Sequence, residues 1–129
     1  LFAFNLKTSL FFGLTLFFCN SIFTFTDISF EIICSQPRSS LDYIEIAREH
    51  HTVFVEGIPQ LSATRDDAAR RFINMVDEFY DRKVKLIATA DVCMQELYTG
   101  SRLKFEFERT VSRLHEMRSK DYLQAAHRP

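Results

Sequence analysis

Two arginines near the C-terminal end of the chain, Arg109 and Arg113, have the side-chain type and spacing to hold a phosphate or a carboxylate. Four residues apart, they would share one face of a helix, beside an apolar stripe of Phe107, Val111 and Leu114. Arginine keeps its charge at any working pH, and its planar guanidinium group fits both anions. An amphipathic helix with two solvated arginines produces the same pattern. The spacing alone favours this second interpretation and leaves the first open.

Three further residues are candidates for a contact with phosphate: Arg70, Arg71 and Thr89. The two arginines fall on an expected helix and could reach a nucleotide or a neighbouring subunit. Asp66 and Asp67, one turn earlier, are their ordinary ion-pair partners. Thr89 closes an expected strand, and chemistry in open parallel sheets gathers at the carboxyl ends of the strands. The hydroxyl group of Thr89 alone is weak evidence for a phosphate contact.

Two acidic residues share these expected strand ends. Glu56 could orient a water molecule or a cation there. Asp91 follows the second strand and is more typical of a cap on the next helix than of a catalytic acid.

Several motifs of known catalytic and binding sites are absent from the sequence, and their absence limits the reactions that this chain could catalyse alone. Its glycines are Gly13, Gly57 and Gly100, so the sequence holds no G-x-x-x-x-G-K-[ST] phosphate loop. It has no G-x-S-x-G elbow and no cysteine–histidine cluster with metal-ligand spacing, so we expect no metal ligands. Its three cysteines form no C-x-x-C pair, which fits a reducing compartment. A net charge of −1 argues against nucleic acid as a partner. No catalytic site is complete within this sequence.

Composition changes sharply along the chain. Residues 1–26 contain eight of the 14 phenylalanines and a single charged residue, Lys7, whereas residues 27–129 have the composition of one globular domain. Three interpretations of the first segment remain open: a membrane-spanning helix over residues 10–25, a signal peptide with Lys7 at its basic end, or non-native coding sequence such as a retained intron. The chain begins at Leu1 rather than at methionine, which suggests a fragment or a truncated gene model.

The rest of the chain predicts an α/β fold built around a strand–helix–strand unit. The strands are the β-branched and aromatic runs 52–56 and 84–89. The helix between them is capped at Thr64 with Asp67 and ends near Asp81. Short joins predict parallel strands with a right-handed crossover. Because two strands cannot form a stable sheet alone, we expect the partner strands to come from outside the chain.

Further helices flank this unit. The first, 41–50, has Ser39 and Asp42 at the spacing of a capping box. Two others follow the second strand, over residues 92–98 and 104–118, and a final turn or helix spans residues 121–126.

A series of segments across residues 28–123 carries a more specific signal. The segments are Phe30-x-x-Ile33-Cys34-x-x-Pro37-Arg38-Ser39-x-x-Asp42-Tyr43, His51-Thr52-Val53-Phe54-x-x-Gly57-Ile58-Pro59, Ala69-Arg70-Arg71-Phe72-Ile73, Val76-Asp77-Glu78-x-Tyr80-Asp81, Val84-Lys85-Leu86, Leu97-Tyr98-x-Gly100, Phe105-x-Phe107-x-Arg109-Thr110-x-Ser112-Arg113-Leu114-x-Glu116-Met117, Ser119 and Tyr122-Leu123. In this order they resemble the C-terminal part of the Afg-one-like ATPases, which include the mitochondrial lactation-elevated proteins and the bacterial cell-division ATPase ZapE.

The resemblance implies an incomplete P-loop NTPase-like fold of AAA type. It implies ATP as substrate with Mg²⁺ in the full-length protein. In this family the phosphate loop and the acidic Walker B strand precede the matched part, so we expect this chain alone to bind neither ATP nor Mg²⁺ and to be inactive. The mitochondrial members imply association with the inner membrane and quality control of respiratory-complex subunits. The implied partners are the rest of the ATPase domain, further copies of the protein and client proteins.

The resemblance also favours a phosphate contact for Arg109 and Arg113 over a solvated helix face. Arg109 and Arg113 fall in the family's signature run, and a late arginine of a P-loop ATPase can stabilise charge on the γ-phosphate, in cis or across a subunit interface. Arg70 and Arg71 are second candidates. The acidic neighbours of the run could instead pair with the arginines and make the run structural: Glu106, Glu108 and Glu116.

Residues 1–26 depart from the family, which has no Phe-rich run at this point. This favours the non-native interpretation of the segment over a membrane anchor. The alternative function is a non-enzymatic interaction module tethered to a membrane by residues 10–25.

Overall fold

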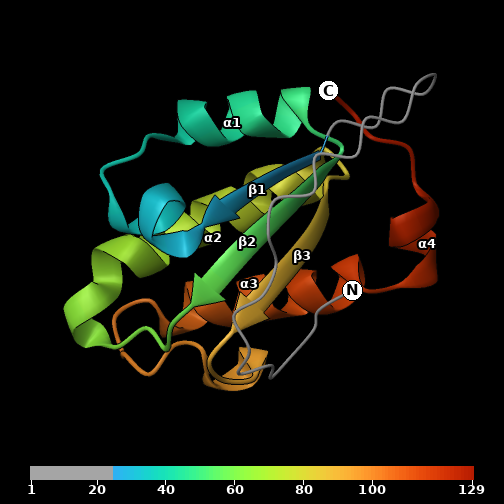
Figure 1. Ribbon diagram of the computed structural model, residues 1–129. Helices are drawn as coiled ribbons and strands as arrows, with labels where there is room; N and C mark the ends of the chain where they lie inside the picture. The colour runs from blue at the N-terminus through green and yellow to red at the C-terminus, as the bar shows by residue number, and fades with distance from the viewer. Residues whose placement is uncertain (1–24) are drawn as a thin grey trace.

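A three-stranded parallel sheet forms the centre of the computed structural model, which describes residues 25–129. The strands lie in the order β1 (Phe25–Ser29), β2 (Thr52–Ile58) and β3 (Lys85–Ala90). Their arrows point the same way in Figure 1, so the three carboxyl ends lie at one edge of the sheet. The predicted α/β class with a parallel sheet is confirmed.

Strand β1 was not expected from the sequence. It pairs in register with β2, from Phe25 opposite Thr52 to Ser29 opposite Glu56. The expectation that every partner strand comes from outside the chain is therefore wrong for β1. The strand also includes Phe25 and Thr26, which lie before the predicted division of the chain at residue 26.

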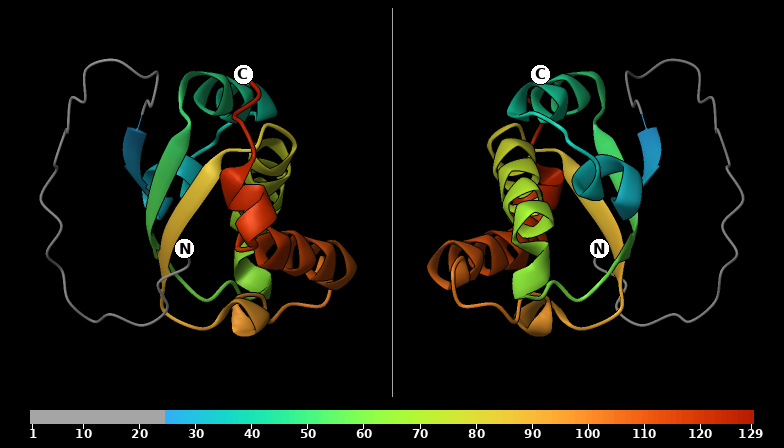
Figure 2. Two further views of the ribbon diagram at one scale, coloured as in Figure 1. Left: turned by 90° about the vertical axis from the view of Figure 1, so that its right-hand side faces the viewer. Right: turned by 90° about the vertical axis from the view of Figure 1, so that its left-hand side faces the viewer.

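The two faces of the sheet differ in what covers them. Figure 2 shows the described helices gathered on one side of the strands, with none on the other. Side chains alternate between the faces, and the face toward the helices is buried at Val53, Val55, Leu86 and Ala88. On the opposite face, Phe54 and Ile87 are half-buried. Parallel sheets are ordinarily covered on both faces, and the described helices cover only one face of this sheet.

Helix α1 (Ser40–Glu49) confirms the expected helix and its cap. The backbone N–H of Ser39 donates to the Asp42 carboxylate at 2.8 Å, and the N–H of Asp42 donates back to the Ser39 carbonyl at 3.1 Å. These two bonds satisfy groups that a helix start otherwise leaves open. A π-helical turn, η1 (Glu31–Ser35), connects β1 to this helix.

Helix α2 (Asp66–Asp81) is the expected crossover helix, but it begins differently. A 3-10 turn, η2 (Ala63–Arg65), precedes it and contains Thr64. The Thr64 hydroxyl lies 2.8 Å from the Ser62 hydroxyl, and the N-cap residue is Arg65, with no side-chain cap. The predicted cap at Thr64 is therefore wrong, because the 3-10 turn takes up the residues that would have formed it.

The expected helix over residues 92–98 is also wrong. Only a short 3-10 turn, η3 (Met94–Glu96), forms there. The N–H of Leu61 donates to the Leu97 carbonyl at 2.6 Å, and the N–H of Thr99 donates to the Leu61 carbonyl at 2.9 Å. These bonds hold residues 97–99 as an extended bridge, which ends any helix before it.

Helices α3 (Lys104–Met117) and α4 (Lys120–Gln124) confirm the last two expected helices. The Ser119 hydroxyl accepts from the Tyr122 N–H at 3.2 Å and caps α4. Helix α3 packs against α2, and Figure 2 shows part of it extending beyond α2, away from the sheet. Among residues 25–129, no helix is long and apolar enough to cross a membrane.

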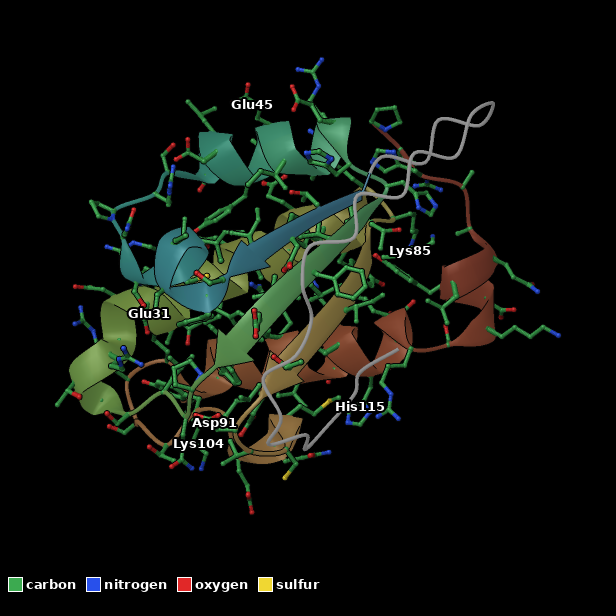
Figure 3. The ribbon with its side chains drawn as sticks, viewed as in Figure 1. Glu31, Glu45, Lys85, Asp91, Lys104 and His115 are labelled. Carbon is green, nitrogen blue, oxygen red and sulfur yellow. The ribbon has the colours of Figure 1, made fainter. Side chains whose placement is uncertain are left out.

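Lys85 anchors the C-terminal segment to the sheet. Its side chain is only 8% exposed, and its Nζ donates to the carbonyls of Lys83 (3.1 Å), Tyr122 (3.1 Å) and Ala125 (2.7 Å). Figure 3 shows Lys85 near the segment that follows α4. A lysine beside the last carbonyls of a helix is favourable for the helix dipole as well. The role of Lys85 is therefore to bind backbone carbonyls.

His51 lies beside the same anchor and makes stability depend on pH. Burial, with the neighbouring charges of Lys85 and His127, lowers the pKa of His51 below its usual 6.5. The unfolded chain then binds more protons than the folded chain as the pH falls through 6.5. We therefore expect the free energy of unfolding to decrease from pH 7.5 to pH 5.5, about one unit on either side of the usual pKa, in urea titrations. His51→Gln should flatten this dependence, whereas His115→Gln, at an exposed site on α3, should not. An unchanged slope in His51→Gln would refute the assignment.

Candidate functional site

The arginines of the signature run converge on one carboxylate of the neighbouring helix. The Arg109 Nη2 donates to Oδ2 of Asp77 at 2.9 Å, and the Arg113 Nη1 donates to Oδ1 of the same residue. Spacing by four residues on α3 places the two guanidinium groups on either side of Asp77, which lies on α2. One carboxylate therefore binds two guanidinium groups.

The glutamates of α3 do not pair with these arginines. Of the four ion pairs within residues 25–129, none joins Arg109 or Arg113 to Glu106, Glu108 or Glu116. Glu116 accepts a hydrogen bond from the Tyr80 hydroxyl at 2.6 Å instead. The expected pairing within α3 is therefore wrong, because α2 presents a closer carboxylate between the arginines.

Arg113 is held more firmly than Arg109. Its guanidinium group lies 5.0 Å from the centre of the Tyr80 ring, and its side chain is 25% exposed. The hydrogen bond to Glu116 fixes this ring and is the main cause that raises the pKa of Tyr80. Arg109 is bonded to Asp77, and its side chain is 54% exposed. The geometry thus gives Arg113 a structural position and leaves Arg109 accessible.

Arg70 and Arg71, the second pair of candidates, also differ from each other in their contacts. The Arg71 Nη1 donates to the Cys34 carbonyl at 3.1 Å, near the end of η1. Burial raises the pKa of the Cys34 thiol to about 12, so this cysteine is an inert part of the core. Arg70 is exposed and has no hydrogen bond or ion pair within the part of the chain that the structure describes. The two arginines therefore do not form one site.

The acids expected to neutralise Arg70 and Arg71 do not do so. Asp66 accepts a hydrogen bond from the Tyr98 hydroxyl at 2.7 Å, and this bond fixes the start of α2 against the extended bridge. Tyr98 in turn accepts from the Leu103 N–H at 3.0 Å, just before α3. Asp66 therefore helps to position the helix that carries Arg109.

Thr89 lies at the carboxyl end of β3, as predicted, and supports a bulge in β2. Its Oγ1 accepts from the Gly57 N–H at 2.9 Å. Gly57 has a φ of 75°, a left-handed conformation that glycine adopts without strain, where the register shifts between Val55 and Ile58. The contact gives Thr89 a structural role, and its predicted contact with phosphate stays a prediction.

Neither acid at the strand ends, Glu56 or Asp91, caps a helix. Glu56 is exposed. Asp91 is exposed too, and its N–H donates to the Ile58 carbonyl at 3.0 Å. The N-cap of η3 is Cys93, so the predicted capping role of Asp91 is wrong.

The described residues do not make a complete site for ATP and Mg²⁺. The sequence holds no phosphate loop, and residues 25–129 contain no group of three or more histidines, cysteines or acids that could hold a metal ion. What they offer is positive charge at Arg70 and Arg109, which could contact a phosphate from one side. A nucleotide bound here would need a phosphate loop and a Mg²⁺ ligand from outside the described residues.

A double-mutant cycle should separate the two arginines. We expect a coupling free energy of about 1.5–3 kcal/mol between Asp77 and the sheltered Arg113, and below about 1 kcal/mol between Asp77 and the exposed Arg109. Urea unfolding of Asp77→Asn, Arg113→Gln, Arg109→Gln and the two double variants measures both terms. Equal coupling of the two pairs would contradict the different roles assigned here.

Sequence reasoning missed Asp77 and Tyr80 as parts of the arginine cluster. One signal was present: Asp77 and Tyr80 are three residues apart on α2, so they share a face. Which helix meets that face cannot be read from spacing.

Comparison of the sequence with those of known proteins identifies relatives of this chain. The sequence model of the AFG1-like ATPase family matches residues 18–126. The cell division protein ZapE of Escherichia coli K12 is 48% identical over 100 residues, which cover 78% of this chain and 27% of ZapE. Lactation elevated protein 1 homolog B of Danio rerio is 33% identical over 131 residues, covering 77% of this chain and 26% of the relative. No solved structure matches.

This chain therefore spans about a quarter of the length of these two relatives. The family match, in contrast, covers most of the chain and includes all the described strands and helices. The chain belongs to the AFG1-like ATPase family.

Proposed function

We propose that this chain forms the C-terminal part of an ATP-hydrolysing domain whose phosphate loop and magnesium-binding acid are supplied by residues outside it. The family match over residues 18–126 carries the proposal. Three features agree with it: a parallel sheet that has no described helix on one face, the absence of a phosphate loop from the sequence, and two arginines of α3 that share one carboxylate of α2. On this account the chain alone does not hydrolyse ATP.

Arg109 is the residue that we assign to the phosphate. Its guanidinium group is accessible and shares Asp77 with Arg113, so it can leave that carboxylate without stranding a buried charge. An arginine that reaches the γ-phosphate stabilises the charge that develops in the transition state. Arg113 has a positioning role, because Tyr80 and Asp77 hold it. Arg70 is the second cation available to a phosphate on this side of α2.

We further propose a mitochondrial location for the full-length protein, with a role in the quality control of inner-membrane subunits. The zebrafish relative, a lactation elevated protein, supports this assignment, whereas the bacterial relative is a cell division protein. Fractionation of cells that produce the full-length protein tests it. Recovery with the mitochondrial fraction is the expected result, and recovery outside that fraction would overturn it.

The complete transcript provides the first test of the enzymatic proposal. We expect coding sequence upstream of this chain for a G-x-x-x-x-G-K-[ST] loop and an acidic strand. The protein made from that transcript should hydrolyse ATP in the presence of Mg²⁺. A complete transcript without the loop would remove the proposed activity.

A further inference from the structure

Strand β1 is an edge strand of the sheet, and within the described residues no other strand pairs with its outer edge. Figure 2 shows it as the outermost of the three strands. Alternate residues of an edge strand direct their N–H and C=O groups away from the sheet. Natural proteins protect such an edge with lysine, proline or a covering segment, because unpaired backbone groups bind other extended chains.

The sequence of β1 carries little of this protection. It contains no lysine and no proline, and its one charged residue is Asp27. Asp27 lies opposite Phe54, whereas Ile28 lies opposite the buried Val55. Side chains alternate along a strand, so Asp27 points to the face without described helices and Ile28 to the face with them. On the helix side, the edge of β1 therefore carries no charge.

A pocket lies beside Ile28 on this helix side. It has a volume of about 100 Å³. Four isoleucines line it, one from β1, two from η1 and one from α1: Ile28, Ile32, Ile33 and Ile46. Ile32 is 47% exposed there. An engineered apolar cavity of about 150 Å³ holds a benzene ring, so this pocket has room for one aliphatic side chain.

The charged side chains of the pocket, Arg38 and Asp42, are bonded within the chain. The Arg38 Nε donates to the Ile32 carbonyl at 3.3 Å. The Asp42 carboxylate accepts from the Ser39 N–H at 2.8 Å, as part of the cap of α1. The isoleucines make the pocket suitable for an apolar group, and neither charged residue requires an ionic ligand.

An open strand edge beside an apolar pocket is the arrangement that binds an added β-strand. Main-chain hydrogen bonds to the edge provide affinity, and a pocket for a side chain provides specificity. Every second side chain of a strand paired with β1 would point to the helix side of the sheet. One of these side chains would reach the pocket between β1, η1 and α1.

We propose that β1 pairs with a further β-strand from the part of the full-length polypeptide outside this chain, and that an aliphatic side chain of this strand fills the pocket. The inference rests on the proposed function, in which that part forms the rest of the ATPase domain. This chain spans about a quarter of the length of two relatives, so ample length remains for another strand. The edge of a five-residue strand is too short to hold a second copy, whereas linkage within one polypeptide raises the effective concentration of the added strand.

Hydrogen exchange tests the added strand directly. The full-length protein and the 129-residue chain are compared by mass spectrometry on peptides that contain β1. We expect the amides of β1 to exchange at least about tenfold more slowly in the full-length protein, because the N–H groups of the outer edge gain partners. Equal exchange of β1 in the two proteins would overturn the inference.

A pair of variants of the full-length protein tests the pocket. Ile32→Glu places a carboxylate among the isoleucines and should make exchange of β1 at least about tenfold faster. Leu41→Glu is the matched control, since Leu41 is 74% exposed on α1 and does not line the pocket. The control should keep the slow exchange of the wild type. Equal exchange of β1 in the two variants would contradict the role of the pocket.

ATP hydrolysis by the same samples separates the inference from the proposed function. Hydrolysis by a full-length protein whose β1 exchanges as fast as in the chain alone would overturn the added strand and leave the ATPase proposal intact. Slow exchange of β1 without hydrolysis would support the added strand and overturn the proposed activity. Protection of β1 that increases with protein concentration would assign the edge to a second copy and overturn the inference.

Discussion

Replacing Arg109 by alanine in the full-length ATPase should lower kcat for ATP hydrolysis by at least about 10³-fold, the effect of losing an arginine that stabilises phosphoryl transfer. The KM for ATP should change little, because the contact forms in the transition state. The substitution should hardly affect folding, since the Arg109 side chain is 54% exposed and its ion pair with Asp77 is an exposed one. Steady-state kinetics with a thermal melt measure both quantities.

Two variants serve as controls for this experiment. Arg48→Ala removes an exposed arginine from α1 and should leave kcat unchanged. Arg113→Ala should lower the melting temperature more than Arg109→Ala does, because Arg113 is held by Asp77 and the Tyr80 ring. Unchanged kcat in Arg109→Ala would remove Arg109 from the catalytic site.

Phe72→Ala should destabilise the chain by about 3–5 kcal/mol, the loss that accompanies truncation of a buried phenylalanine. Phe72 is fully buried on α2, with ring centres of Phe30 at 6.1 Å and Phe107 at 6.0 Å. It thus joins the segment after β1 to α3 through the crossover helix, and the cavity would open at the centre of the fold. Urea unfolding followed by circular dichroism measures the change.

The matched control for the core is Phe105→Ala, which removes the same side chain from an exposed site. Its effect should stay within about 0.5 kcal/mol of the wild type, as for other surface positions. A loss below about 1 kcal/mol in Phe72→Ala would contradict the central position of that ring.

The sequence predicted elements whose signals are local. The apolar spacing of α2 and the β-branched runs of β2 and β3 each lie within one segment, and their short joins predicted parallel pairing. The capping box at Ser39 was recognised for the same reason. These features depend on neighbours along the chain, which the sequence displays directly.

Features that depend on distant partners were missed. Strand β1 is five residues long and carries Asp27 at its centre, so its strand character comes from pairing with β2. Residues 97–99 are held extended by Leu61, far earlier in the chain, against a local preference for helix. Lys85 has an ordinary sequence context and becomes a buried donor because the C-terminal segment returns to it.

The candidate site shows the same limit. The four arginines were identified from type and spacing, but their division into a sheltered Arg113, an accessible Arg109, a free Arg70 and a bound Arg71 depends on how α2, α3 and η1 pack. Asp77 decides this division, and it lies 32 and 36 residues before the arginines that it binds.

The rate of ATP hydrolysis by the purified full-length protein, compared with that of the 129-residue chain alone, tests the central claim most directly. We predict Mg²⁺-dependent hydrolysis by the full-length protein that Arg109→Ala abolishes, and no hydrolysis above the buffer rate by the chain alone. Hydrolysis by the chain alone, or its absence from a folded full-length protein, would contradict the claim.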